Sequence, residues 1–282
     1  MAVAKTGSGG GGAAGDQEAG EIADGERIVS LHAGYETARN ETARNETESV
    51  YTNAFLARPV DGKPRPGVVL LSGMGGLTWT QREITRRYAR AGFVALSPDY
   101  MGGQLPANRA EGLQAKNSLD VTAAVEELAG GARFLRGLPW VGPEGKVGIM
   151  GFCLGGGLAL LAAARTDAFQ AGIVYHQSLF PDVRELEGID CQLQCHYGTE
   201  DHSTPREEVE AFSRALDRLG KTYELHWYEG MGHSFAQITP DADVPADQGQ
   251  ASDLSYERSF EFLRRQLGGH GPGVAEAPEA AG

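Results

Sequence analysis

Short apolar runs alternate with longer helical segments along the chain from residue 50 onwards. The run Gly67-Val-Val-Leu-Leu71 is continuously apolar, which is typical of a strand buried on both faces of a sheet. The patterns predict strands at 50–57, 67–71, 93–97, 146–150, 171–175, 191–195 and 223–227, and helices at 80–91, 117–136, 156–165, 205–219 and 252–267. This alternation favours an α/β domain with a mostly parallel central sheet and helices on both faces. In such sheets, sites form beyond the carboxyl ends of the strands, so chemically active residues are expected there.

The chain of 282 residues is long enough for one large domain, which we place at residues 25–267. We expect residues 1–24, which are rich in glycine and alanine, and residues 268–282 to be disordered. Neither segment can bury enough apolar surface to offset the entropy lost on ordering. A five-residue repeat covers 36–40 and 41–45, and it is too short for a repeat fold. We interpret it as a duplicated loop or the edge of a hairpin.

Charge and cysteine content exclude several classes of protein. The formal net charge of −13 argues against a nucleic-acid surface, because binding to phosphates needs clustered lysine and arginine. No segment approaches the ~18–20 apolar residues of a membrane span, and the N-terminus lacks the apolar run of a secretory signal. We therefore expect a cytoplasmic protein with no membrane partner. The three cysteines, Cys153, Cys191 and Cys195, are too few for a disulfide framework, and in a reducing compartment a single thiol can serve as a nucleophile.

The segment Gly151-Phe152-Cys153-Leu154-Gly155 is the strongest chemical signal in the sequence. It follows the predicted strand 146–150 and leads into the predicted helix 156–165, which is the context of a nucleophile elbow, with cysteine in place of the usual serine. The flanking glycines suit a tight turn in which a β-carbon would clash, and the helix N-terminus favours the reactive thiolate. The alternative is a buried cysteine at a tight junction between a strand and a helix.

Two further polar residues follow the next predicted strands in the order that such a site requires. Asp201 comes after the strand 191–195, and His233 comes after the strand 223–227. A cysteine needs a base to hold or shuttle its proton, and an imidazole needs an acceptor that fixes its tautomer. Separately, Asp201 could cap the next helix and His233 could be a turn residue. Because the three residues fall on expected loops in the order nucleophile, acid, histidine, we predict a catalytic triad.

Backbone N–H groups are expected to form the oxyanion hole. Leu154, directly after the nucleophile, provides one donor, and Met74 in the loop Ser72-Gly73-Met74-Gly75-Gly76 provides the second. A glycine-rich loop can also bind phosphate. This loop, however, lacks the Gly-Lys-Ser/Thr ending of a P-loop and the full dinucleotide fingerprint.

Residues 50–267 resemble the dienelactone hydrolases, also called carboxymethylenebutenolidases. The most specific stretches are Gly-Phe-Cys-Leu-Gly-Gly at 151–156, the segment 196–205, and His-Trp-Tyr-Glu-Gly-Met-Gly-His-Ser-Phe-Ala at 226–236. The resemblance implies an α/β-hydrolase fold, a triad of Cys153, Asp201 and His233, and hydrolysis of an enol-lactone without a cofactor. The implied partner is a small ester or lactone, bound by a monomer or a small homo-oligomer.

Three positions depart from or qualify the family pattern. Two arginines bind the substrate carboxylate in the family, and one of them corresponds to Arg109 here. The other corresponds to Gln237, so one carboxylate contact is missing. The acidic residue that helps to activate the cysteine is replaced by Gly73. We also assign Phe235 to the substrate pocket, although its pattern suits a core position as well.

These departures keep other functions open. An isomerase, a cyclase or an acyltransferase could use the same pocket on a small metabolite, and a binding protein could have kept the fold without catalysis. The remaining polar candidates suit structural roles better. Cys191 and Cys195 share one strand face with Leu193, which indicates a packed core and no metal site. His202 is interpreted as a solvated turn residue, and His176, at the end of strand 171–175, as a residue that either packs or faces the pocket.

Overall fold

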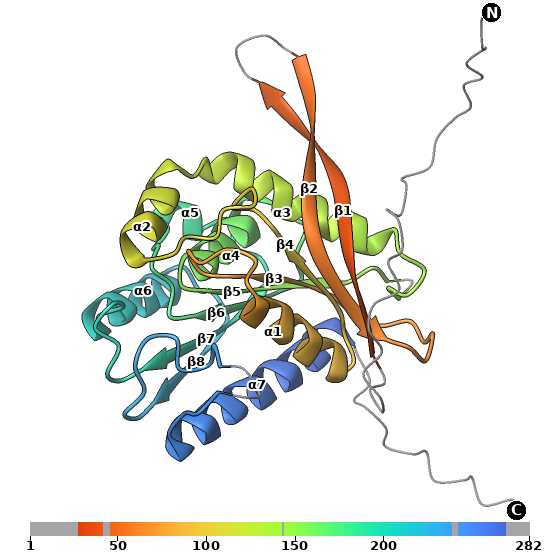
Figure 1. Ribbon diagram of the computed structural model, residues 1–282. Coiled ribbons are helices and arrows are strands. Elements are labelled where there is room, and N and C mark those ends of the chain that lie inside the picture. Colours follow the sequence, from red (N-terminus) through yellow and green to blue (C-terminus); the bar gives the residue numbers. More distant parts are fainter. Residues whose placement is uncertain (1–27, 42–45, 143, 239–241, 269–282) are drawn as a thin grey trace, which may run out of the picture.

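The computed structural model describes residues 28–41, 46–142, 144–238 and 242–268. The tails expected to be disordered lie outside the described residues, apart from Gly268. Over the described part of the chain, one twisted sheet forms the centre of the molecule, with helices against both of its faces (Figure 1). The predicted α/β architecture is confirmed.

The described sheet contains eight strands in the order β1-β2-β4-β3-β5-β6-β7-β8. From β4 to β8 all neighbours are parallel, whereas β1 and β2 pair with their neighbours in antiparallel fashion. The strands are β1 (Ile28–Glu41), β2 (Glu46–Pro59), β3 (Gly67–Leu71), β4 (Val94–Pro98), β5 (Val147–Phe152), β6 (Ala171–Tyr175), β7 (Gln192–Gly198) and β8 (Tyr223–Tyr228). The parallel arrangement brings the carboxyl ends of β3, β5, β6, β7 and β8 to one edge of the molecule.

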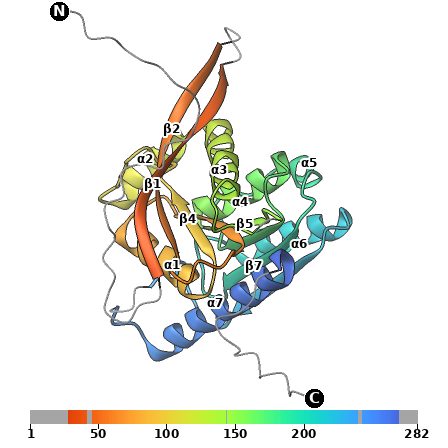
Figure 2. The ribbon, with the colours of Figure 1, turned by 90° about the vertical axis from the view of Figure 1, so that its right-hand side faces the viewer.

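The hairpin of β1 and β2 is the main element that the sequence patterns did not predict in full. Only residues 50–57 were expected as a strand, yet β1 pairs with β2 from Ile28 opposite Pro59 to Glu41 opposite Glu46. β2 contacts β4 only over Ala54–Ala57, so the distal part of the hairpin extends beyond the sheet (Figure 2). The five-residue repeat falls in this hairpin, except for residues 42–45, which lie outside the described residues.

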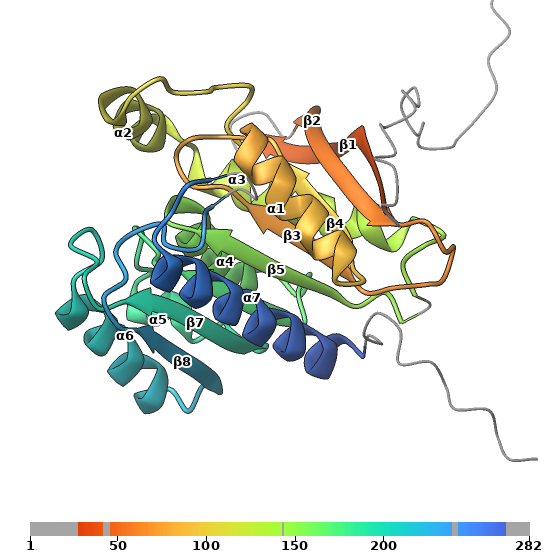
Figure 3. The same cartoon turned by 60° about the horizontal axis from the view of Figure 1, so that its bottom comes forward.

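Helices cover the two sheet faces in separate layers. α1 (Trp79–Arg90) and α7 (Ala246–Leu267) pack on one face, and α3 (Val121–Arg136), α4 (Leu154–Arg165) and α6 (Arg206–Arg218) pack on the other (Figure 3). Two shorter helices, α2 (Arg109–Ser118) and α5 (Val183–Leu186), lie in the connections that follow β4 and β6. No helix in the described part of the chain combines the length and the apolar character that crossing a membrane requires.

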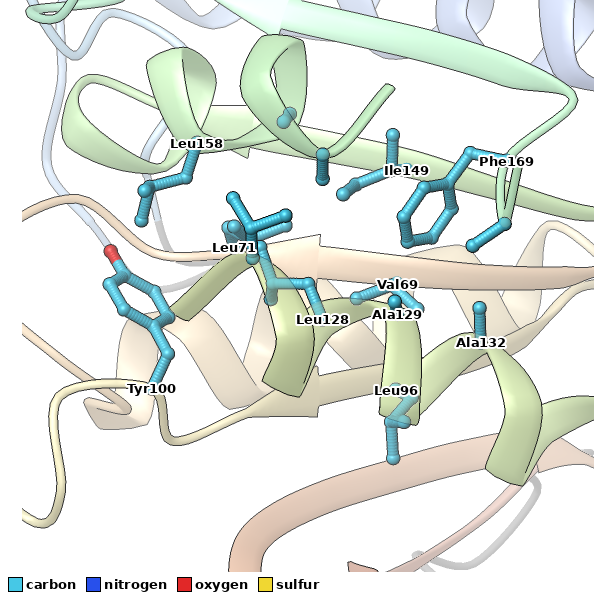
Figure 4. Packing of buried hydrophobic residues seen from close by; sticks show 14 of the residues in the cluster. Val69, Leu71, Leu96, Tyr100, Leu128, Ala129, Ala132, Ile149, Leu158 and Phe169 are labelled. Carbon is cyan, nitrogen blue, oxygen red and sulfur yellow. The ribbon is translucent and has the colours of Figure 1, made fainter. Parts of the chain in front are cut away.

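Alternating side chains of the buried strands supply the two halves of the core. Val69 and Leu71 of β3 point toward α3 and α4, where they meet Leu128 and Leu158 (Figure 4). The intervening Val68 and Leu70 face α1 and α7. Both sets are fully buried, which explains why this strand reads as a continuous apolar run.

The predicted helix 117–136 is wrong at its beginning. The structure has two helices there, and Leu119 between them is extended, with φ −69° and ψ 125°. Asp120 ends the connection as the N-cap of α3, because its carboxylate accepts a hydrogen bond of 3.0 Å from the Ala123 backbone N–H. An aspartate that binds the backbone in this way favours a helix start over a helix interior.

The cap generates a stability prediction. Asp120→Ala should lower the free energy of unfolding by about 1 kcal/mol, because it removes the acceptor for an unpaired helix N–H group. Asp120→Ser keeps an acceptor and should remain closer to the wild type. Urea denaturation followed by circular dichroism measures both, and an equal loss in the two variants would contradict the capping role.

Candidate active site

Cys153 forms a one-residue turn between β5, which ends at Phe152, and α4, which begins at Leu154. Its φ of 53° and ψ of −115° are unusual for a residue with a side chain and store strain of about 1–3 kcal/mol. The turn is possible because the residues two positions before and after Cys153 are glycines. A β-carbon on Gly151 would lie 2.1 Å from the carbonyl oxygen of Gly155, and one on Gly155 would lie 2.3 Å from the carbonyl oxygen of Ser72.

Backbone hydrogen bonds hold this turn in place. The Cys153 N–H donates to the carbonyl of Tyr175 at 3.0 Å, and the Cys153 carbonyl accepts from the N–H groups of Gly156 at 3.1 Å and Ser178 at 3.0 Å. The side chain lies at the N-terminus of α4, where the helix dipole favours a negative charge. The residue is 9% exposed, so the thiol is accessible from one side only.

Asp201 and His233 lie beside Cys153 at the carboxyl ends of the next strands. The Nδ1 atom of His233 is 2.8 Å from Oδ2 of Asp201, which fixes the ring and leaves Nε2 for the thiol. The other carboxylate oxygen of Asp201 accepts backbone N–H groups from Ser203 at 2.8 Å and Thr204 at 3.0 Å. The Asp201 side chain is 1% exposed and the His233 side chain 23% exposed, so the acid is buried behind the base.

The ionisation of these groups is coupled. Burial alone would raise the pKa of the Cys153 thiol, but hydrogen bonds from His233 and Ser178, the charge on His233 and the Leu154 N–H hold it below its ordinary value. Burial opposes protonation of His233, yet its hydrogen bonds to Asp201 and Cys153 raise its pKa to about 9. Burial would raise the pKa of Asp201, but the hydrogen bond and the charge of His233, together with the Ser203 N–H, lower that pKa below its ordinary value. At neutral pH the arrangement favours a thiolate beside an imidazolium.

The loop after β3 faces the thiol from the opposite side. Tyr100 donates its hydroxyl hydrogen to the carbonyls of Ser72 at 2.7 Å and Gly73 at 3.3 Å, which holds the loop next to Cys153. A β-carbon on Gly73 would lie 3.3 Å from Cβ and 4.0 Å from Sγ of Cys153. Met74, expected to contribute an oxyanion-hole N–H, lines the pocket that contains Cys153, and the Leu154 N–H interacts with the thiol directly.

A pocket of about 170 Å³ opens onto these groups. Its lining comprises the loop after β3, the start of α1 and the segment around His233: Ser72, Gly73, Met74, Gly75, Gly76, Thr78, Thr80, Gln81, Cys153, His233, Ser234 and Gln237. Apart from Cys153 and His233, this described lining has no titratable side chain. Two larger pockets, of about 310 and 530 Å³, contain neither Cys153 nor His233 and so offer no comparable chemistry.

The predicted substrate-binding residues have different positions. Gln237 lines the pocket as expected. Phe235 does not: it is 2% exposed and packs in the core, with its ring centroid 4.8 Å from that of Tyr228. The assignment of Phe235 to the pocket is therefore wrong, because its side chain turns into the sheet layer covered by α7. Arg109 is exposed at the first position of α2 and is not among the residues that line the pocket.

The two other cysteines and His202 have the structural positions expected of them, whereas His176 lies against His233. Cys195 is fully buried with Leu193, Cys191 is partly buried, and His202 is exposed. His176 is fully buried, and its ring centroid lies 4.2 Å from that of His233. Burial lowers the pKa of His176 to about 3, so it is neutral beside the charged pair.

One described group has the spacing of a metal site. One ligand atom each from His176, Asp201 and His233 all lie within 4.8 Å of one another. Asp201 and His233 already share a hydrogen bond, so an ion here would displace the proton between them.

Sequence reasoning missed two residues that contact the thiol region, Ser178 and Lys116. Ser178 interacts with the Cys153 side chain, and Lys116 donates to Ser178. The position of Ser178, three residues beyond the predicted strand 171–175, was a usable signal because loops at strand ends carry active residues. Lys116 gave no such signal, since α2 itself was not predicted.

Comparisons with known proteins identify the family to which the chain is similar. Residues 52–267 match the profile of the dienelactone hydrolase family. The chain is 28% identical over 209 residues to a carboxymethylenebutenolidase of Pseudomonas putida, an alignment that covers 71% of this chain and 86% of that one. It is 30% identical over 230 residues to a protein of Bradyrhizobium sp. named as a probable 2-oxo-3-(5-oxofuran-2-ylidene)propanoate lactonase, covering 77% of this chain and 90% of that protein.

A solved structure has the same fold as this chain. A dienelactone hydrolase-like promiscuous phosphotriesterase from metagenomic libraries superimposes with a TM-score of 0.66 and 22% identity, over 83% of this chain and 98% of that chain. At this identity the likeness concerns the fold, and it confirms the predicted α/β-hydrolase architecture.

The three thiols should differ in reactivity. Iodoacetamide at pH 7.5 should label Cys153 first, because burial raises the pKa of Cys191 to about 11 and that of Cys195 to about 12, whereas the Cys153 pKa is lowered. Peptide mapping over a time course measures the order. Labelling of Cys191 or Cys195 ahead of Cys153 would contradict the electrostatic description of the site.

Proposed function

This chain belongs to the dienelactone hydrolase family and is a hydrolase, and we propose that it cleaves small esters or lactones through an acyl-enzyme on Cys153. In this proposal His233 is the acid and base, and Asp201 orients and stabilises its ring. The observation that carries the proposal is the 2.8 Å hydrogen bond between Asp201 and a His233 ring that also interacts with the Cys153 thiol. No step of this chemistry calls for a cofactor, because the three side chains supply nucleophile, base and acceptor.

Acylation begins with the thiolate of Cys153, which attacks the carbonyl carbon of the substrate. The charge that develops on the carbonyl oxygen is stabilised by the backbone N–H groups of Leu154 and Met74. When the carbon–oxygen bond of the ester breaks, His233 gives its Nε2 proton to the departing oxygen. The imidazole is then neutral and remains hydrogen-bonded to Asp201.

Deacylation reverses the direction of proton transfer. His233 takes a proton from water, the hydroxide attacks the thioester carbonyl, and the carbon–sulfur bond breaks. The thiolate and the imidazolium are restored together, which the mutual stabilisation of Cys153 and His233 favours. For a lactone, both the released hydroxyl and the new carboxyl group remain on one product.

Isomerase, cyclase and acyltransferase activities are less well supported than hydrolysis. Among the curated relatives above, the names given are a carboxymethylenebutenolidase and a lactonase, which are hydrolases. We therefore propose water as the second substrate.

The acyl-enzyme is tested with a cysteine variant and a matched control. Cys153→Ala should reduce kcat/KM on an uncharged chromogenic ester by about 10³-fold or more, because it removes the nucleophile. Cys191→Ala should retain activity, since this residue precedes the amino end of β7 and does not line the pocket. In acid-quenched wild-type samples, mass spectrometry should find the acyl group on the peptide that contains Cys153. Full activity of Cys153→Ala, or an adduct on another residue, would refute the mechanism.

The pocket lining favours uncharged substrates. A buried carboxylate needs charge-assisted hydrogen bonds, for which arginine is the usual donor. Gln237 offers a neutral donor, and the exposed Arg109 does not line the pocket. We therefore propose that the protein prefers uncharged small esters or lactones to carboxylated ones.

Variants that introduce a positive or a negative charge at position 237 test this preference. A hydrogen bond to a charged group is worth ~1.5–3 kcal/mol against ~1 kcal/mol for a neutral one, so Gln237→Arg should improve kcat/KM for a carboxylated dienelactone relative to an uncharged ester by about tenfold. Gln237→Glu should shift the same ratio in the other direction. A wild-type ratio that strongly favours the carboxylated substrate, or shifts of equal sign in both variants, would rule the preference out.

A further inference from the structure

Helix α2 lies against the active-site loops and not merely at the surface. A β-carbon on Gly112 would lie 3.1 Å from Sδ of Met74, so the helix backbone packs closely on the residue assigned to the oxyanion hole. One turn later, Lys116 is partly buried and extends toward the loop after β6. The helix therefore connects two loops that face the thiol.

Lys116 is hydrogen-bonded to Ser178 at two atoms. Its Nζ atom lies 2.9 Å from the Ser178 carbonyl oxygen and 3.3 Å from the Ser178 hydroxyl oxygen. A lysine ammonium has only donors, so the hydroxyl accepts from Lys116 and its own hydrogen is free to donate elsewhere.

Ser178 in turn holds Cys153 at two points. Its backbone N–H donates to the Cys153 carbonyl at 3.0 Å, and its side chain is one of the hydrogen-bonding groups that lower the pKa of the Cys153 thiol. Because the hydroxyl accepts from Lys116, its hydrogen is available to donate to the sulfur, which accepts best as a thiolate.

The other groups around the thiol are compatible with a hydrogen bond from the Ser178 hydroxyl to the sulfur. His233 is the one charged partner on the side of β8, and behind it lie Asp201 and the neutral His176. On the side of β3 lie Gly73, which has no side chain, and Tyr100. Burial raises the pKa of the Tyr100 hydroxyl, so this group stays neutral. Among these described neighbours, Lys116 is the positive charge that binds Ser178, at 2.9 Å from its carbonyl oxygen and 3.3 Å from its hydroxyl oxygen.

We propose that Ser178 and Lys116 stabilise the thiolate of Cys153, Ser178 by donating its hydroxyl hydrogen to Sγ and Lys116 by orienting and polarising that hydroxyl. The two are positioning residues that act through the nucleophile. The inference rests on the proposed function for its catalytic meaning, but its effect on the thiol can be measured without turnover.

The test is the pH dependence of alkylation. The rate of iodoacetamide labelling at Cys153, read by peptide mass spectrometry, is measured between pH 5 and 10 for the wild type, Lys116→Met and Ser178→Ala. Loss of the donor or of the positive charge disfavours the thiolate, so the midpoint should move to higher pH in both variants. Labelling below the midpoint should slow by about 3- to 10-fold, equivalent to a shift of about 0.5–1 pH unit.

Matched variants separate this role from a structural one. Lys146→Met removes the same charge at the opposite end of β5, next to Glu144, and should leave the midpoint unchanged. Lys116→Arg and Ser178→Thr keep the charge and the hydroxyl, and should leave the midpoint close to that of the wild type. Because Lys116 acts through the hydroxyl, Lys116→Met should have a smaller effect in the Ser178→Ala background than in the wild type.

The possible results distinguish failure of this inference from failure of the proposed function. Wild-type midpoints in both Lys116→Met and Ser178→Ala, with melting temperatures showing folded proteins, would overturn the proposal, as would an equal shift in Lys146→Met. If Cys153→Ala kept full esterase activity while the midpoints shifted, the proposed function would fail and this inference would stand.

Discussion

The one-residue turn at Cys153 is the constraint on which the rest of the site depends. The strand β5 and the helix α4 meet so closely that β-carbons on Gly151 and Gly155 would overlap the backbone. The strain of the turn is tolerated because hydrogen bonds from β6 and from the following loop hold Cys153 on several sides. The same close approach places the sulfur at a helix N-terminus and at the edge where the parallel strands end, so the other active residues need only follow neighbouring strands.

Electrostatic coupling converts that geometry into chemistry. A thiol as buried as Cys153 would ordinarily stay protonated, because burial disfavours the charged form. Cys191 and Cys195 show this behaviour, with raised pKa values. At Cys153 the hydrogen bonds and the charge of its partners together lower the thiol pKa more than burial raises it. One of these partners, His233, is itself held protonated by Asp201. The thiol with the lowered pKa and the thiols with raised pKa values thus differ in their neighbours and hardly in their burial.

Much of the fold and of the proposed site was predictable from local patterns. Continuous apolar runs marked the parallel strands, because such strands are buried on both faces. Glycines around Cys153, and polar residues directly after two strands, marked the candidate triad. Predictions failed where one pattern has two structural explanations. An aromatic residue beside His233 suits a pocket wall or the core, and Phe235 belongs to the core. A helical pattern across 117–136 concealed the break at Leu119 and the cap at Asp120.

The sequence by itself determined the order of the parallel strands and of the longer helices between them, the tight turn at Cys153, and the loops on which Asp201 and His233 lie, because each depends on residues close together in the chain. Only the tertiary structure decided what surrounds the sulfur. Lys116 and Ser178 are 62 residues apart, and the contact between them exists because α2 folds over the loop after β6. Likewise, Arg109 matches a family position in sequence but lies exposed at the start of that helix. Side-chain proximity across the sheet edge is set by packing, which local patterns do not encode.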